Sequence, residues 1–156
     1  MRTAVRSCAI ISGLVLLFTA SLAGAACTVA TTNVFFGGYD AFRATPLDST
    51  GSVTVTCDQN PPTDITVAIG PSGTSGGFAP RRMAHSSMPD RLSYNLFTDA
   101  SMNVIWGDGT SSTSTVMLRK INRNRPKSAT IYGRIPPGQN VSSGPYADRL
   151  TVTITP

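Results

Sequence analysis

The feature of this sequence that most constrains its fold is a repeated alternation of apolar and polar residues in short runs. Residues 53–57, 65–69 and 92–96 each place an apolar side chain at every second position. A period of two is typical of a strand with one buried face, because successive side chains point to opposite sides of a sheet. Turn-forming residues separate the runs, and no stretch after residue 25 has the period of a helix. About seven such strands predict an all-β protein, an antiparallel immunoglobulin-like β-sandwich.

The C-terminal stretch from Tyr132 to Thr155 predicts a hairpin of strand, tight turn and strand. Pro136-Pro137-Gly138 is typical of a turn, and Leu150, Val152 and Ile154 share one face of the final strand. The sequence offers no later segment to cover this strand. We therefore expect an incomplete sandwich that lacks its last strand, and an apolar edge that pairs with another chain.

Several other segments give weaker signals. We expect a first strand at 27–29 that continues through 34–36, a strand at 116–121 and a hairpin turn at Asp108-Gly109. We also expect Trp106 to face the core from a strand end, together with four other aromatic residues: Phe35, Phe36, Phe78 and Tyr94. Two adjacent arginines, Arg81 and Arg82, are candidates for surface ion pairs with Asp90 or Asp99.

The N-terminus has the composition of a secretory signal peptide. Arg2 and Arg6 precede an apolar run at 9–17, and Ala23-Gly24-Ala25 matches an A-x-A cleavage site. We therefore predict a signal peptide at 1–25 and a single domain at 26–156. Acylation of Cys27 is a weaker alternative, because Gly24 stands where a lipobox has Leu. We expect no membrane insertion of the mature chain, since no second apolar segment follows.

Cysteine usage fits an exported protein. Cys8 lies in the predicted signal peptide, which leaves Cys27 and Cys57. Two thiols in an oxidising compartment most simply form one disulfide. A metal pair or two free thiols are the alternatives, but the sequence has a single His to complete a zinc site. We expect no metal and no cofactor.

The order and spacing of several short motifs resemble the spore coat protein U domain family, whose members include pilins of archaic chaperone–usher systems. The similar segments span the whole of the predicted mature chain. They are Tyr39-Asp40, residues 45–48, 51–57, 78–83, 92–100, 106–110, 132–136, Gly138-Gln139, Gly144, 146–148 and the final Thr/Val strand.

The resemblance implies a secreted structural subunit of a surface pilus, fimbria or coat, assembled by donor-strand complementation. Its implied partners are a periplasmic chaperone, an usher and neighbouring pilin-like subunits, and its implied location is the periplasm and then the cell surface. A lent strand would bind by backbone hydrogen bonds and by alternate side chains in a groove. We place that groove along five apolar residues: Val34, Phe36, Leu150, Val152 and Ile154.

Two departures from the family pattern bear on the place of this subunit in a fibre. Cleavage after Ala25 leaves one residue before Cys27, so we see no alternating apolar extension to donate. The chain ends on Pro156 instead of an aromatic residue, and Pro has no N–H for a strand ladder. Both departures favour a tip or end subunit over a repeating shaft unit.

A basic stretch supports an alternative function, a free-standing surface adhesion or polysaccharide-binding module. Five cations lie close together: Arg119, Lys120, Arg123, Arg125 and Lys127. They could contact an anionic partner, although such runs are more often solvated faces. The stretch has no interleaved aromatic residues, and we expect no nucleic-acid binding.

The sequence offers little for catalysis. His85 is the only His in the sequence, and it belongs to no recognisable triad. All eight acidic residues are Asp, and the sequence shows no close carboxylate pair. We therefore predict that the protein is not an enzyme.

Overall fold

The computed structural model describes residues 26–58 and 60–156, and it contains nine strands and no helix in those ranges. The strands are β1 (Cys27–Thr32), β2 (Leu47–Cys57), β3 (Thr63–Ile69), β4 (Arg81–His85), β5 (Arg91–Phe97), β6 (Val116–Ile121), β7 (Lys127–Ile135), β8 (Tyr146–Ala147) and β9 (Val152–Thr155). The all-β prediction is confirmed. The predicted signal peptide lies outside the described residues and stays a prediction.

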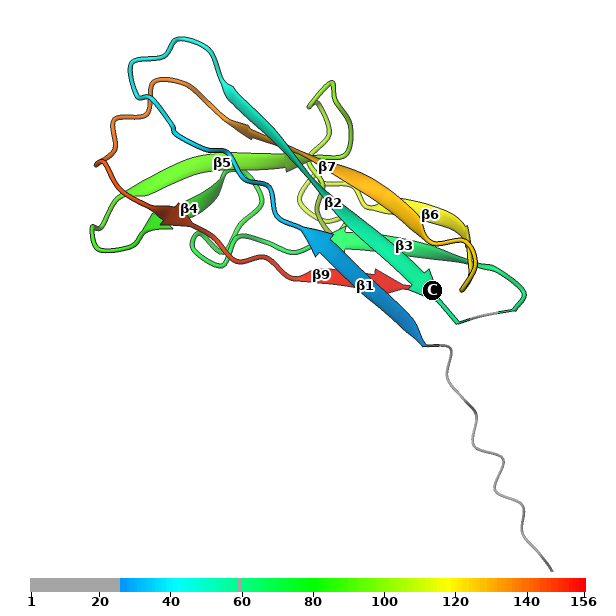
Figure 1. The fold of residues 1–156 in the computed structure, drawn as a ribbon. Helices are drawn as coiled ribbons and strands as arrows, with labels where there is room; N and C mark the ends of the chain where they lie inside the picture. The colour runs from blue at the N-terminus through cyan, green and yellow to red at the C-terminus, as the bar shows by residue number, and fades with distance from the viewer. Residues whose placement is uncertain (1–25, 59) are drawn as a thin grey trace, which may run out of the picture.

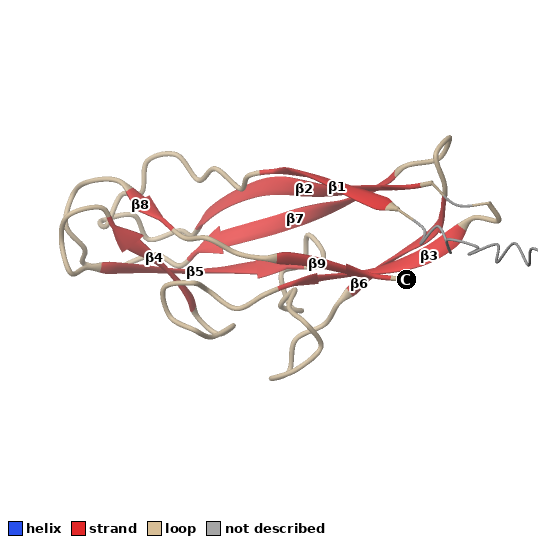
Figure 2. Cartoon of the chain, turned by 90° about the horizontal axis from the view of Figure 1, so that it is seen from below, coloured by secondary structure: helices blue, strands red, loops and turns tan. Residues whose placement is uncertain are grey.

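The strands form two sheets that face each other (Figures 1 and 2). The first has six strands in the order β1-β2-β7-β5-β4-β8, and the second has three in the order β6-β3-β9. Every strand pairing is antiparallel. Seen edge-on, β1 and β2 lie in one layer and β6 and β9 in the other (Figure 2).

The alternation seen in the sequence builds the core between the layers. Inward-facing residues of β2, β3 and β5 are buried, whereas their alternate neighbours are partly exposed. Trp106 is fully buried, as expected, and its indole Nε1 donates a hydrogen bond to the carbonyl oxygen of Val67 at 3.0 Å. Phe78 and Tyr94 are buried, but 83% of Phe35 is exposed, so its core assignment was wrong.

The predicted terminal hairpin is wrong, because β7 and β9 lie in different sheets. β7 pairs with β2 and β5, whereas β9 pairs with β3. The chain that leaves β7 is held against β5: the side chain of Gln139 accepts a hydrogen bond from Ser93 N at 2.7 Å and donates one to Ser93 O at 2.9 Å. The chain then pairs with β4 as β8 before β9 begins.

Two local predictions are also corrected. Trp106 forms a parallel bridge with Ser114, so Asp108-Gly109 does not close a hairpin. Asp108 instead accepts hydrogen bonds from the backbone N–H and hydroxyl of Thr110, which folds the segment into a loop of its own. β1 ends at Thr32, and Val34–Phe36 continues as extended chain outside the sheet.

Arg81 ties the two layers together from the interior, which overturns the expected surface ion pair. It is fully buried, and its guanidinium donates to the carbonyl oxygens of Ile69, Gly70 and Trp106 at 3.2, 2.9 and 2.8 Å. It also donates to Asn95 Oδ1 at 3.0 Å. Burial lowers the pKa of Arg81 below its usual value, because the charged form loses its water.

Candidate functional site: an open groove between the sheets

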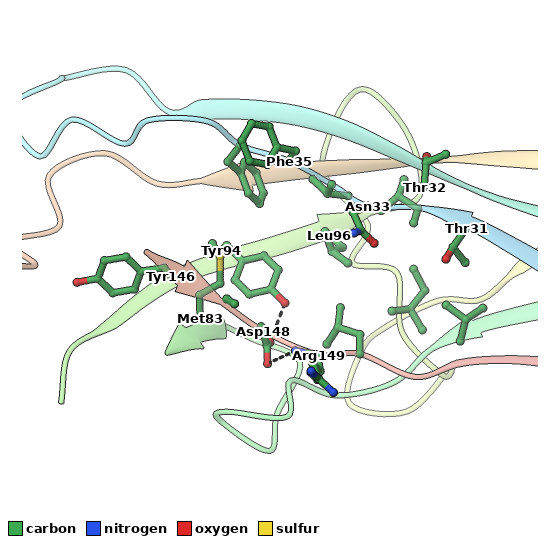
Figure 3. Close-up of a pocket in the computed structure, with 17 residues that line it drawn as sticks. Thr31, Thr32, Asn33, Phe35, Met83, Tyr94, Leu96, Tyr146, Asp148 and Arg149 are labelled. Carbon is green, nitrogen blue, oxygen red and sulfur yellow. Dashed lines mark hydrogen bonds between the residues drawn. The ribbon is translucent and has the colours of Figure 1, made fainter. Parts of the chain in front are cut away.

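A groove of about 540 Å³ runs between the two layers, where β1 and β9 lie at the edges of their sheets (Figure 3). One wall is the segment 31–36, and the other is the segment 146–150 with Val152. The floor is contributed by inward-facing side chains of the core strands: Ile69, Met83, Tyr94, Leu96 and Ile131. Most of these side chains are apolar, so an occupant of the groove would cover apolar surface.

The walls of the groove include strand edges whose backbone N–H and C=O groups have no strand neighbour within the described residues. Within the described residues, β1 pairs only with β2 and β9 pairs only with β3. Each strand therefore keeps one edge without a neighbour. Because an unpaired edge presents a row of N–H and C=O groups, the two walls are a template for an additional strand.

A second hollow of about 590 Å³ extends the groove away from β9. It lies between the segments 34–42 and 141–146, and it shares part of its lining with the first hollow. The shared residues are Val34, Phe35, Phe36, Met83 and Tyr146. The two hollows are therefore parts of one continuous trough.

Glycines in the core strands make room for the wall that contains Val34 and Phe36. A Cβ on Gly133 of β7 would lie 2.6 Å from Val34 Cγ1 and 2.8 Å from Phe36 Cζ. A Cβ on Gly51 of β2 would lie 2.6 Å from the carbonyl oxygen of Thr32. The chain leaving β1 can cross the inner face of the sheet only because these positions lack side chains.

A Gly133→Ala substitution tests this packing. Alanine normally suits a strand better than glycine, but here overpacking against Val34 and Phe36 should lower the free energy of unfolding by about 1–3 kcal/mol. The measurement is a denaturant melt of the purified chain. Gly77→Ala is the matched control, since its added Cβ meets nothing within 4 Å. Equal stability of the two variants would contradict the close approach.

One polar pair joins the floor of the groove to a wall. The hydroxyl of Tyr94 donates a hydrogen bond to Asp148 Oδ2 at 2.8 Å (Figure 3). Burial, together with this hydrogen bond, raises the pKa of Tyr94, so the phenol stays protonated at neutral pH. The ring of Tyr94 also packs edge-on against Phe36, with 6.1 Å between the ring centroids.

Four of the five predicted groove residues lie in the lining: Val34, Phe36, Leu150 and Val152. Ile154 does not, because it lies farther along β9, opposite Val67. Sequence reasoning placed Tyr94 in the core but did not assign it to the groove. It did not identify Asp148 as a groove residue, because nothing in the local sequence marks it. That these residues accept a strand stays a prediction.

Cys27 and Cys57 form a disulfide with an S–S distance of 2.08 Å. It joins directly opposed residues at the start of β1 and the end of β2. Cys57 is fully buried, so the bond anchors the edge strand to the core.

The basic residues lie around the β6–β7 connection, away from the groove. Arg119 pairs with Asp64 at 3.8 Å and Arg123 pairs with Asp58, so two of the five cations have acidic partners. Asp64 also accepts a hydrogen bond from the backbone N–H of Lys120 at 2.8 Å. These contacts reduce the local positive charge. A role for Arg125, Lys127 and their neighbours in binding an anionic partner stays a prediction.

His85 serves the structure of a loop. Its Nδ1 accepts hydrogen bonds from the backbone N–H groups of Ser87 and Met88 at 3.1 and 3.0 Å, which leaves Nε2 to donate to Ser143 O at 3.1 Å. Both ring nitrogens are therefore engaged by backbone. In the part of the chain that the structure describes, no group of three His, Cys, Asp or Glu residues could hold a metal ion, and no helix is long and apolar enough to span a membrane.

Comparison with known proteins agrees with this architecture. The family model of the Spore Coat Protein U domain matches residues 6–153. Protein U of Myxococcus xanthus is 34% identical over 128 residues, which cover 77% of this chain and 69% of that protein.

Among solved structures, the chain is similar to one in the CsuC–CsuE chaperone–tip adhesion subunit pre-assembly complex, from archaic chaperone-usher Csu pili of Acinetobacter baumannii. The TM-score is 0.59 at 20% identity, and the match covers 83% of this chain but 39% of the other. At this identity the likeness shows the shared fold alone.

Proposed function

Because the chain belongs to the spore coat protein U domain family, we propose that it is a secreted structural subunit of a surface pilus or coat, completed by a strand from another chain. Its role is structural and not catalytic. Its partners are a periplasmic chaperone during export and neighbouring subunits, delivered by an usher, in the fibre. We include a tip or end position in this proposal, because the predicted cleavage after Ala25 would leave a single residue before Cys27.

One observation carries this proposal: the trough lies between two strand edges that have no neighbour within the described residues. Each wall of the first hollow contains about six residues, which corresponds to roughly 20 Å of extended chain. That length suits a strand of ordinary size. A strand placed there would gain ladder hydrogen bonds and would bury alternate side chains against the apolar floor, which is the mode of β-strand addition.

The similarity to the solved pilus complex supports the same proposal by analogy. That complex contains a chaperone and a tip adhesion subunit of chaperone-usher pili. A chaperone that lends a strand protects the same apolar trough that a neighbouring subunit fills later. This chain offers a trough of that kind.

The test is a thermal melt of the purified, oxidised chain with and without an alternating apolar peptide from a neighbouring pilin-like gene. A peptide that binds only the native state should raise the melting temperature by about 10 °C at 100 times its dissociation constant. A scrambled peptide of the same composition should have no effect. A high melting temperature that no such peptide changes, from a monomer, would overturn the proposal.

Two substitutions on one strand locate the binding site. Val152 lines the groove, whereas Thr153 points to the opposite, exposed face of β9. Val152→Asp should abolish the peptide-induced rise, because it places a charge against the apolar floor. Thr153→Asp should leave the rise intact. Equal peptide responses from the two variants would show that the peptide binds elsewhere.

A further inference from the structure

The two carboxylate oxygens of Asp148, in the groove wall, have different hydrogen-bond partners. Oδ1 accepts three hydrogen bonds: from the backbone N–H and hydroxyl of Thr74, both at 3.2 Å, and from the backbone N–H of Arg149 at 2.9 Å. These bonds fasten the groove wall to the loop before β4. Oδ2 accepts from Tyr94 alone among the described residues.

Oδ2 therefore has acceptor capacity to spare. A carboxylate oxygen accepts about two hydrogen bonds, and Tyr94 supplies one of them. Asp148 lines the groove, and Figure 3 shows its carboxylate under the hydroxyl of Tyr94 on the groove floor. In the open groove, water can donate the second hydrogen bond to Oδ2.

A strand that fills the groove changes this situation. Much of the lining of this hollow is apolar and includes Phe36, Met83 and Leu150. A strand with only aliphatic side chains would exclude water from Asp148 Oδ2 and would supply no side-chain hydrogen-bond donor in its place. A carboxylate oxygen that loses its water without gaining a donor is strongly penalised. An occupant that brings a donor avoids this penalty.

We infer that the strand accepted by this groove carries a side-chain hydrogen-bond donor at the one position that faces Asp148, among apolar residues at its other inward positions. The inference rests on the proposed function. Threonine suits the position best, because it has the shape of valine, favours strands and presents one hydroxyl donor. Tyr94 and Asp148 thereby set the register and the specificity of the incoming strand.

The experiment is a threonine scan of the occupant. Peptides of about 12 residues alternate valine with outward polar residues, and threonine replaces one inward valine at a time. Affinity for the purified chain is measured by fluorescence anisotropy at fixed pH and salt. Threonine should weaken binding at most inward positions, where its hydroxyl meets apolar surface. At one position it should tighten binding about tenfold relative to the all-valine parent.

A pair of variants assigns the effect to the carboxylate. Asp148→Leu has a similar size but no hydrogen-bonding group, so the preference for threonine should disappear. Asp58→Asn removes a charge outside the groove lining, and the preference should persist there. Thermal melts without peptide verify that both variants are folded.

The outcomes separate the inference from the proposed function. If no peptide of the series binds the folded parent, the proposed function fails. If peptides bind but threonine never improves affinity, the groove accepts strands and the inference is wrong. A threonine preference that survives in Asp148→Leu also overturns it, because the hydroxyl would then bind some other group.

Discussion

An Arg81→Met variant is expected to lose about 3–5 kcal/mol of unfolding free energy, measured by denaturant titration. The linear methionine side chain fills much of the same space but donates no hydrogen bond. Three buried or half-buried carbonyl oxygens, of Ile69, Gly70 and Trp106, then lose their donor at once. Ile69 is the last residue of β3 and Gly70 follows it, whereas Arg81 belongs to β4, so the loss loosens the contact between the two sheets.

Two further variants separate the effect of the buried hydrogen bonds from that of the charge. Arg82→Met changes the adjacent, exposed arginine and should alter stability by less than about 0.5 kcal/mol, as surface substitutions do. Arg81→Lys keeps the charge but cannot reproduce the fork of donors, so it should resemble Arg81→Met more than the parent. If Arg81→Lys is as stable as the parent, the charge matters and the hydrogen-bond geometry does not.

Removing the disulfide is the second change with a large expected effect. A Cys27→Ala/Cys57→Ala double variant should lose about 3–4 kcal/mol, because the bond closes a loop with a sequence separation of 30. The loss arises mainly from the greater freedom of the unfolded chain. The measurement is again a denaturant titration under two-state conditions.

Reduction provides the control for this prediction. Treating the parent with a thiol reductant should lower its stability to about the level of the double variant, whereas the double variant should not respond. A reduced parent that retains full stability would mean that the β1–β2 ladder alone holds the edge strand. In that case the covalent bond would have no measurable role in the fold.

The sequence predicted the strands well because their signal is local. In residues 53–57, 65–69 and 92–96 the alternation of side chains is sufficient to identify a half-buried strand. It does not say which sheet a strand joins, because both inner faces of a sandwich have the same pattern. The terminal hairpin failed for this reason: β7 and β9 alternate alike. Long-range contacts of the intervening chain, with β5 through Gln139 and with β4 through β8, separate the two strands.

The groove was predicted in part for the same reason. Val34, Phe36, Leu150 and Val152 are apolar residues in extended segments, so they are visible locally. Tyr94 and Asp148 are 54 residues apart, and an Asp beside an Arg near a strand end is typical of a solvated loop. Arg81 was misassigned on similar grounds, because its burial depends on carbonyl groups brought together from distant segments.

The position of the disulfide determines how the subunit would carry mechanical load. Cys27 and Cys57 are the first of the six residue pairs between β1 and β2. Tension applied to β1 by a strand seated in the groove therefore reaches β2 through a covalent bond as well as through the β1–β2 ladder. β2 lies between β1 and β7, so the force enters an internal strand and the edge strand cannot be unzipped from its N-terminal end. One wall of the groove thus keeps its shape while the chain is pulled.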